Sequence, residues 1–94
     1  MAKYVVLANW TDQGIKNAKD TVTRSQQVSE AATAMGGSLD TILWALGRYD
    51  VVVIATFPDD ETAAKFGVKV AAQGNVRTET LRAFTADEVA GIVG

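Results

Sequence analysis

Two apolar segments repeat one another in the two halves of the chain. Residues 5–12, VVLANWTD, match residues 52–59, VVIATFPD, position by position, and four of the eight positions are identical. A weaker likeness relates residues 37–41 to residues 74–78. Each half is therefore predicted to run strand, helix, glycine stop, strand. Chance similarity between two short β-rich segments is the alternative.

A long amphipathic helix is predicted after the first repeated strand. It runs from about residue 12 to residue 35, with Thr11 as its N-cap and Gly36-Gly37 as its end. Small and apolar side chains recur at spacings of three and four and define its buried face: Ile15, Ala18, Val22, Ser25, Ser29 and Ala32.

A second helix is predicted after the second repeated strand. It runs from about residue 60 to residue 73, with Asp59 as its N-cap and Gly74 at its end. Gly67 inside it costs about 1 kcal/mol relative to alanine. We expect a close approach of this helix to the sheet to explain the glycine.

The remaining strands complete an α+β fold of the ferredoxin-like type. Residues 39–46 and 50–57 form a predicted hairpin, residues 76–84 form the last strand, and residues 86–93 form a short terminal helix. The order β-α-β-β-α-β is that of an antiparallel sheet with both helices on one face, with the two repeated strands in the middle. The length fits a single domain over residues 1–94.

Both faces of the central strands are apolar, which predicts self-association. Val5 and Leu7 point to one face, and Val6 and Ala8 point to the other. The helices can cover only one face, and soluble monomers seldom expose an apolar patch of several hundred Å². A second copy of the chain is the simplest cover. A larger ring or cage is an open alternative, because the edge strands can pair further.

Composition narrows the possible chemistry. The 94 residues include no cysteine and no histidine, so disulfides and cysteine nucleophiles are excluded, and metal and haem sites lose their commonest ligand. The formal charge of −2 comes from scattered residues, so no nucleic-acid partner is predicted. No segment approaches the roughly 20 apolar residues of a membrane helix, and the first apolar run is too short for a signal core. We therefore predict a cytoplasmic protein without cofactors.

The hairpin tip is the first candidate site. Arg48, Tyr49 and Asp50 place a guanidinium, a phenol and a carboxylate side by side, which suits a small acid or a quinone-like ligand. The structural alternative is stronger: Gly47 supplies a positive φ, Asp50 bonds the turn backbone, and Tyr49 packs across a neighbouring strand.

The end of the first strand is the second candidate site. Asn9, Trp10 and Asp12 form a polar and aromatic cluster where the strand meets a helix N-terminus, which attracts anions. Asn9 interrupts an apolar strand, and buried amides need partners. Thr56 is its counterpart in the repeat, so both are expected to face the same space between elements. Capping alone is the structural alternative for Asp12.

Other polar groups are interpreted as structural. The acids at residues 59–61 match the dipole of a helix N-terminus, so no metal site is predicted. Glu79 and Arg82 lie on opposite faces of the last strand and cannot act together.

Three segments of the chain resemble the GYD domain family, small bacterial and archaeal proteins grouped with the dimeric α/β barrels. They are residues 4–14 (YVVLANWTDQG), residues 47–52 (GRYDVV) and residues 74–84 (GNVRTETLRAF), and the resemblance covers nearly the whole chain. Arg48 interrupts the three letters of the family name. The resemblance implies a ferredoxin-like protomer that pairs sheet to sheet into a dimeric α/β barrel, and it implies no established activity.

Two functions follow as hypotheses. The first is a homodimer that binds a small, partly apolar or aromatic ligand, or that serves as an interaction module. The wider barrel group includes cofactor-independent oxygenases, lactone isomerases, haem enzymes and effector-binding domains, so the fold alone cannot choose among them. The second hypothesis is accordingly a cofactor-independent oxygenase or isomerase acting on an aromatic or enolisable compound, with Asn9, Trp10 and Tyr49 orienting the substrate.

Overall fold

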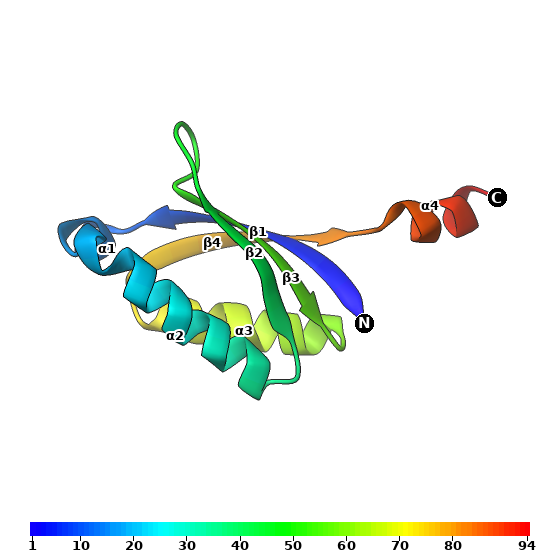
Figure 1. The fold of residues 1–94 in the computed structure, drawn as a ribbon, viewed down its shortest axis with the longest axis horizontal. Helices are drawn as coiled ribbons and strands as arrows, with labels where there is room; N and C mark the ends of the chain where they lie inside the picture. Colours follow the sequence, from blue (N-terminus) through cyan, green and yellow to red (C-terminus); the bar gives the residue numbers. More distant parts are fainter.

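The computed structural model describes every residue from Met1 to Gly94 and confirms the predicted order of elements. Along the chain these are β1 (Ala2–Trp10), α1 (Asp12–Lys16), the 3₁₀-helix η1 (Ala18–Asp20), α2 (Thr21–Ala34), β2 (Ser38–Trp44), β3 (Val51–Phe57), α3 (Asp60–Ala72), β4 (Val76–Ala83) and α4 (Ala86–Val93). α2 and α3 both lie on one side of the sheet (Figure 1). The fold is therefore α+β with a ferredoxin-like topology.

The sheet is antiparallel throughout, with the strand order β2-β3-β1-β4. The two strands of the sequence repeat, β1 and β3, are central, as predicted. Their side chains alternate between two faces. Tyr4 pairs with Ala55, and both are buried beneath α2 and α3 on what we call the helix face. Val5 pairs with Ile54 on the opposite side, which we call the open face.

The first predicted helix is wrong in its continuity, because α1 is only five residues long and η1 separates it from α2. The Arg24 guanidinium donates to the carbonyl oxygens of Asn17 at 2.8 Å and Gly14 at 3.3 Å, which satisfies groups that a continuous helix would bond internally. The break separates Ile15 from the faces of α2, and both Ile15 and Val22 of the predicted buried face are exposed. Ala32 of the predicted face is buried in the core as expected. The other residues of α2 and its C-cap that pack on the core are Val28, Ala31 and Met35.

Gly14 allows α1 to rest directly on the loop before β4. A Cβ atom at Gly14 would lie 2.0 Å from the carbonyl oxygen of Asn75, so any side chain would displace that loop. The Thr11 N–H donates to the same carbonyl at 3.1 Å, and the Thr11 hydroxyl donates to the carbonyl of Gly74 at 2.5 Å. Thr11 is the N-cap of α1, as predicted, because its hydroxyl oxygen accepts a hydrogen bond from the Gly14 N–H. These bonds join the loops at one end of the sheet.

α3 begins as predicted but does not approach the sheet closely. The Asp59 carboxylate caps it by accepting from the Thr62 N–H at 2.8 Å. The expectation for Gly67 is wrong, because a Cβ atom there would meet nothing within 4 Å. Gly67 therefore borders open space between the helix and the sheet.

The core lies on the helix face and is small. Only nine of the 94 residues are buried. Phe57 is the largest fully buried side chain, and its ring centroid lies 6.0 Å from that of Tyr4 and 5.0 Å from that of Phe66. Short chains bury a smaller fraction of their surface than long ones, and this chain leaves one whole face of its sheet out of the core.

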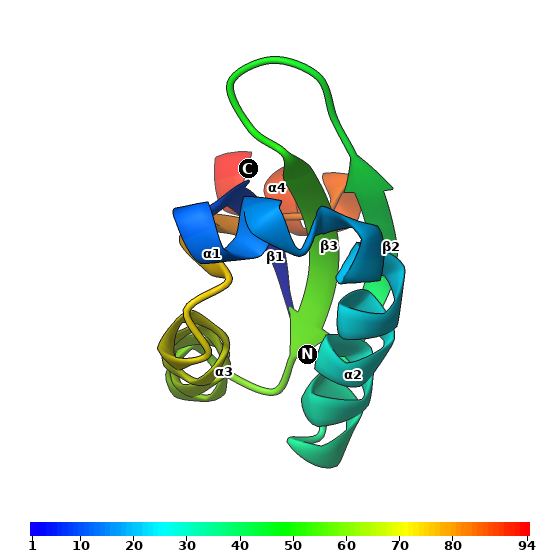
Figure 2. The same ribbon diagram turned by 90° about the vertical axis from the view of Figure 1, so that its left-hand side faces the viewer.

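α2 and α3 leave the open face of the sheet uncovered (Figure 2), and the middle of this face is apolar. Val5 of β1 lies between Ile54 of β3 and Leu81 of β4 in one row across the sheet. The next row pairs Leu7 with Val52, and Leu43 extends it onto β2. Most of these side chains are only partly shielded by their neighbours, and Leu43 and Leu81 are exposed.

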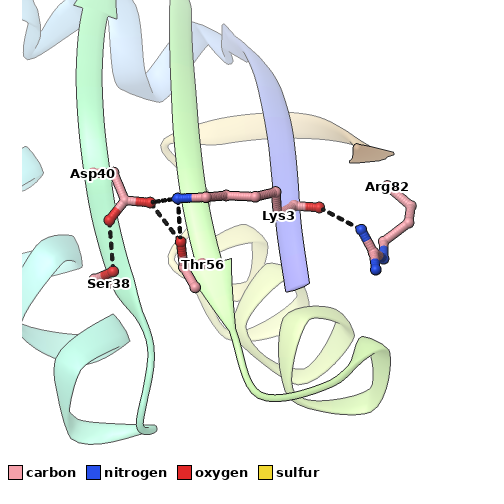
Figure 3. A network of polar contacts seen from close by, with 5 residues as sticks. All are labelled: Lys3, Ser38, Asp40, Thr56 and Arg82. Atoms are coloured by element: carbon pink, nitrogen blue, oxygen red, sulfur yellow. Dashed lines mark hydrogen bonds and ion pairs between the residues drawn. The ribbon is translucent and has the colours of Figure 1, made fainter. Parts of the chain in front are cut away.

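A polar network closes one end of the open face (Figure 3). The Lys3 ammonium donates to Asp40 Oδ2 at 3.0 Å and to Thr56 Oγ1 at 2.9 Å, and the Thr56 hydroxyl donates to Asp40 at 2.6 Å. Hydrogen bonds from Thr56 and Ser38, aided by Lys3, lower the pKa of Asp40 to about 2. Thr56 lies opposite Lys3, whereas Asn9 lies at the far end of β1. The expectation that Asn9 and Thr56 share one space is therefore wrong, because the antiparallel pairing of β1 and β3 reverses the order of the repeat.

Two segments project from the body at opposite ends of the sheet. The loop between β2 and β3, residues 45–50, rises away from the side that carries α2 and α3, and α4 extends beyond the end of β4 (Figure 1). Both segments stand clear of the helix layer in Figure 1. No helix of the structure has both the length and the apolar character needed to cross a bilayer.

Candidate functional site

The sequence-predicted site residues separate onto two faces of the sheet. Asn9 and Trp10 are neighbours in β1, so their side chains point to opposite faces. Asn9 lies on the open face near Arg48 and Tyr49, whereas Trp10 lies on the helix face. Asp12 is exposed at the first turn of α1. The structure therefore brings Asn9, Arg48 and Tyr49 together and leaves Trp10 and Asp12 apart from them.

A polar recess of about 260 Å³ lies on the open face beside the hairpin tip. Its lining includes Asn9, Arg48, Tyr49, Arg77 and Glu79. The Tyr49 hydroxyl donates to Glu79 Oε2 at 2.9 Å, and this hydrogen bond raises the pKa of Tyr49. The phenol is therefore held in its protonated form, as a donor rather than a base.

Asp50 fixes the base of the hairpin to the end of β1. Its carboxylate accepts from the Trp10 N–H at 2.9 Å, and its own N–H donates to the Ala8 carbonyl at 3.0 Å. Its carbonyl accepts from the Ala45 N–H at 2.9 Å across the loop. Gly47 has a φ of 113°, which a residue with a side chain rarely adopts. These contacts make Asp50 and Gly47 structural parts of the hairpin.

The second cavity lies between the helix face and the pair α2 and α3, with a volume of about 100 Å³. Fifteen of its 23 lining residues are hydrophobic. The aromatic lining comprises Tyr4, Trp10, Trp44, Phe57 and Phe66. Gly67 lies on the same face of α3 as Ala63, four residues earlier, and the missing side chain leaves part of this space empty.

The polar lining of this apolar cavity gathers where β1 ends and β4 begins. It includes Arg24, Gln73 and Asn75, which come from α2, from the C-terminus of α3 and from the loop before β4. The Arg24 guanidinium is engaged by the two backbone carbonyls at the end of α1. The Trp44 indole N–H donates to the Thr21 hydroxyl at 3.0 Å. Tyr4 and Arg24 are the only ionisable side chains on the cavity wall.

Of the residues that line this cavity, sequence reasoning included only Trp10 among its candidate site residues. Its walls come from all four strands and two helices, so no local motif marks it. One signal was present in the sequence: the second half of the chain places Thr78 and Thr80 on the helix face of β4, where a tightly packed core would prefer apolar side chains.

The Tyr4 hydroxyl joins α3 and β4 at the other end of the cavity. It donates to Asp60 Oδ1 at 2.5 Å, and Arg82 Nε lies 3.6 Å from the same oxygen. Burial, followed by the hydrogen bond to Asp60, raises the pKa of Tyr4 to about 12. Glu79 points to the open face, so Arg82 pairs with Asp60 and not with Glu79, as the strand alternation predicted.

Alkaline conditions should expose the role of Tyr4. Because the pKa of Tyr4 is higher in the folded chain than the ordinary value of 10, the unfolded chain loses this proton first. The protonated Tyr4 hydroxyl contributes about 2 kcal/mol to the free energy of unfolding. This contribution is fully present below pH 10 and is lost as pH rises toward 12. Tyr4→Phe should remove this loss in urea unfolding, measured as a difference from the wild type at each pH. An unchanged alkaline slope in Tyr4→Phe would contradict the assignment.

The fold and its sites define a small α+β protein of ferredoxin-like topology, with an uncovered sheet face and an apolar cavity beneath its helices. A family model described as the GYD domain matches residues 4–93. The chain belongs to this family, as its three family-like segments predicted. No curated protein and no solved structure matches the chain.

Proposed function

We propose that the protein is a homodimer in which each protomer binds a small, largely apolar ligand in the cavity between the helix face and α2 and α3. The observation that carries the proposal is the cavity itself: about 100 Å³ of space lined mostly by hydrophobic side chains in a protomer of only 94 residues. An apolar cavity of about 150 Å³ stays dry and accepts benzene, so this smaller space suits a ligand of about one ring.

The lining indicates the class of ligand. Five aromatic side chains contribute faces and edges against which a flat ring can pack. Gln73 and Asn75 offer amide donors and acceptors at one end. A neutral aromatic compound with one polar substituent fits this arrangement, since no carboxylate or free cation on the wall would pair with a charged ligand.

The open face supports the dimer. Its apolar middle is bounded by the Lys3–Asp40 network at one end and by Asn9, Arg77 and the Tyr49–Glu79 pair at the other. An apolar centre within a polar rim is the usual anatomy of a protein interface. Two open faces in contact would form the dimeric α/β barrel. The recess that holds Asn9, Arg48 and Tyr49 would then belong to the rim.

Binding is favoured over catalysis by the same cavity. A proton-transfer enzyme needs a titratable group facing its substrate. Tyr4 is committed to Asp60, and Arg24 is committed to backbone carbonyls. The oxygenase or isomerase hypothesis therefore draws no specific support from the wall. The cytoplasmic location stays a prediction.

Filling the cavity from α3 tests the ligand proposal. Toluene and p-cresol are the probes, and we expect saturable binding to the wild type by ligand-observed NMR and by quenching of tryptophan fluorescence. Gly67→Leu places a side chain in the empty space and should weaken binding at least about tenfold, which corresponds to about 1.4 kcal/mol. Gly67→Ala is the control: it should retain most of the binding and stabilise α3 by about 1 kcal/mol.

The outcomes separate ligand binding from structural packing. Loss of binding in Gly67→Leu with an unchanged circular dichroism spectrum supports the cavity as the site. Absence of saturable binding of either probe to the wild type would overturn the proposal, and so would equal binding to the wild type and Gly67→Leu.

A further inference from the structure

α4 is a well-formed helix that lacks a partner within its own chain. The Thr85 hydroxyl accepts from the Glu88 N–H at 3.2 Å, and the Glu88 carboxylate accepts from the Thr85 N–H at 2.9 Å, which completes a capping box. None of its eight residues is buried. Isolated helices this short are marginal in water even for favourable sequences. The helix therefore needs a surface to pack on.

One face of α4 is apolar and exposed. Val89, Ile92 and Val93 are spaced three and four residues apart, which places them on the same side of the helix. Their exposed fractions are 41, 63 and 79%. Phe84, in the short segment that leads to α4, is also exposed. The acids Asp87 and Glu88 lie in the first turn.

The hairpin tip is the matching unpartnered feature at the other end of the sheet. Leu46 is fully exposed there. The Arg48 guanidinium forms no ion pair within the chain and contacts only the Tyr49 ring, 5.8 Å from its centroid. β3 begins opposite Ala8, and β4 ends opposite Lys3, so the tip and α4 lie at opposite ends of β1.

We propose that α4 is an exchanged arm that docks on the hairpin tip of the second copy. The inference rests on the proposed dimer. A twofold axis that lies between two open faces, perpendicular to the strands, brings each α4 to the end of the paired sheets that carries the partner's hairpin tip. Val89 and Ile92 then cover Leu46 of the partner subunit. Asp87, which forms no ion pair in its own chain, comes near Arg48 of the partner subunit.

The size of the open face also calls for such an addition. Four strands of seven to nine residues span roughly 20 by 25 Å, about 500 Å², whereas a standard interface buries about 800 Å² on each partner. The arm and the hairpin tip extend the contact at both ends of the sheet. The contact also covers the two apolar surfaces that a single chain leaves exposed, namely the apolar face of α4 and Leu46 at the hairpin tip.

Disulfide cross-linking tests the proposal. Because the chain has no native cysteine, any disulfide joins two introduced residues. Leu46→Cys and Ile92→Cys are prepared as separate full-length chains of different tag length, mixed, and oxidised under mild conditions. We expect the mixture to form a disulfide-linked heterodimer as its main product on a non-reducing gel. Both positions are on the surface, so neither substitution removes a core contact. The matched control pairs Ile92→Cys with Val68→Cys, another exposed position, which lies on α3, and should give little heterodimer.

Sedimentation of the wild type separates failure of the arm from failure of the dimer. A dimer with no Leu46→Cys to Ile92→Cys link would overturn the arm and leave the dimer standing. An Ile92→Cys chain that links mainly to itself would show that the two arms meet one another, which also contradicts the proposal. A wild type that sediments as a monomer overturns both inferences.

Discussion

Ile54→Lys is expected to convert the proposed dimer into folded monomers. Ile54 lies in the middle of the open face, between Val5 of β1 and Thr41 of β2. The twofold symmetry would bury two unpaired ammonium groups in one interface, and a buried charge without a partner costs several kcal/mol. We expect the dissociation constant to rise at least about 100-fold, or about 3 kcal/mol. Sedimentation equilibrium over micromolar concentrations measures the change.

The control places the same charge on the helix layer. Val22 of α2 is exposed and lies outside the sheet, so Val22→Lys should leave the dissociation constant unchanged. Both variants should retain the circular dichroism of the wild type. If Ile54→Lys dimerises as tightly as Val22→Lys, the open face is not the interface.

Phe57→Ala should produce the largest loss of stability of any single core substitution. Phe57 is 1% exposed and links Tyr4 of β1 to Phe66 of α3. Truncating a buried phenylalanine costs about 3–5 kcal/mol through lost burial and a residual cavity. A chain this short has a small reserve, so we expect a shift of the urea midpoint that leaves a large unfolded fraction in buffer.

Phe57→Leu distinguishes lost volume from lost aromatic character. A shape change that conserves most of the volume usually costs less than about 1.5 kcal/mol. We expect this variant to remain folded, with a midpoint between those of the wild type and Phe57→Ala. Equal losses for the two variants would show that the ring contacts, and not the filled space, dominate at this position.

The strands were predictable because the physics that forms them is local. Repeated apolar runs rich in valine mark β1 and β3 and indicate their central place in the sheet. The helix break near Asn17 was not predictable from the sequence. It depends on hydrogen bonds from Arg24 to two backbone carbonyls and on the contact of Gly14 with Asn75. Periodicity within one segment carries no information about such contacts.

The candidate site was also only partly predictable from the sequence. Alternation along β1 already implied that Asn9 and Trp10 point apart, but their adjacency in the sequence suggested one cluster. The placement of Asn9 beside Tyr49 follows from the hairpin folding back along β1. The apolar cavity was beyond sequence reasoning, because it exists only through the spacing of α2 and α3 over the sheet and the open space at Gly67.

The strand order has a consequence for how the molecule is assembled. The sequence repeat divides the chain near the hairpin tip, with β1 and β2 in the first half and β3 and β4 in the second. Every strand pair in the sheet joins one half to the other: β1 with β3, β1 with β4, and β2 with β3. Neither half can make a single ladder alone, so the native state is reached only when both halves interleave. A half-length ancestor with this pattern would have had to build its sheet from two separate chains.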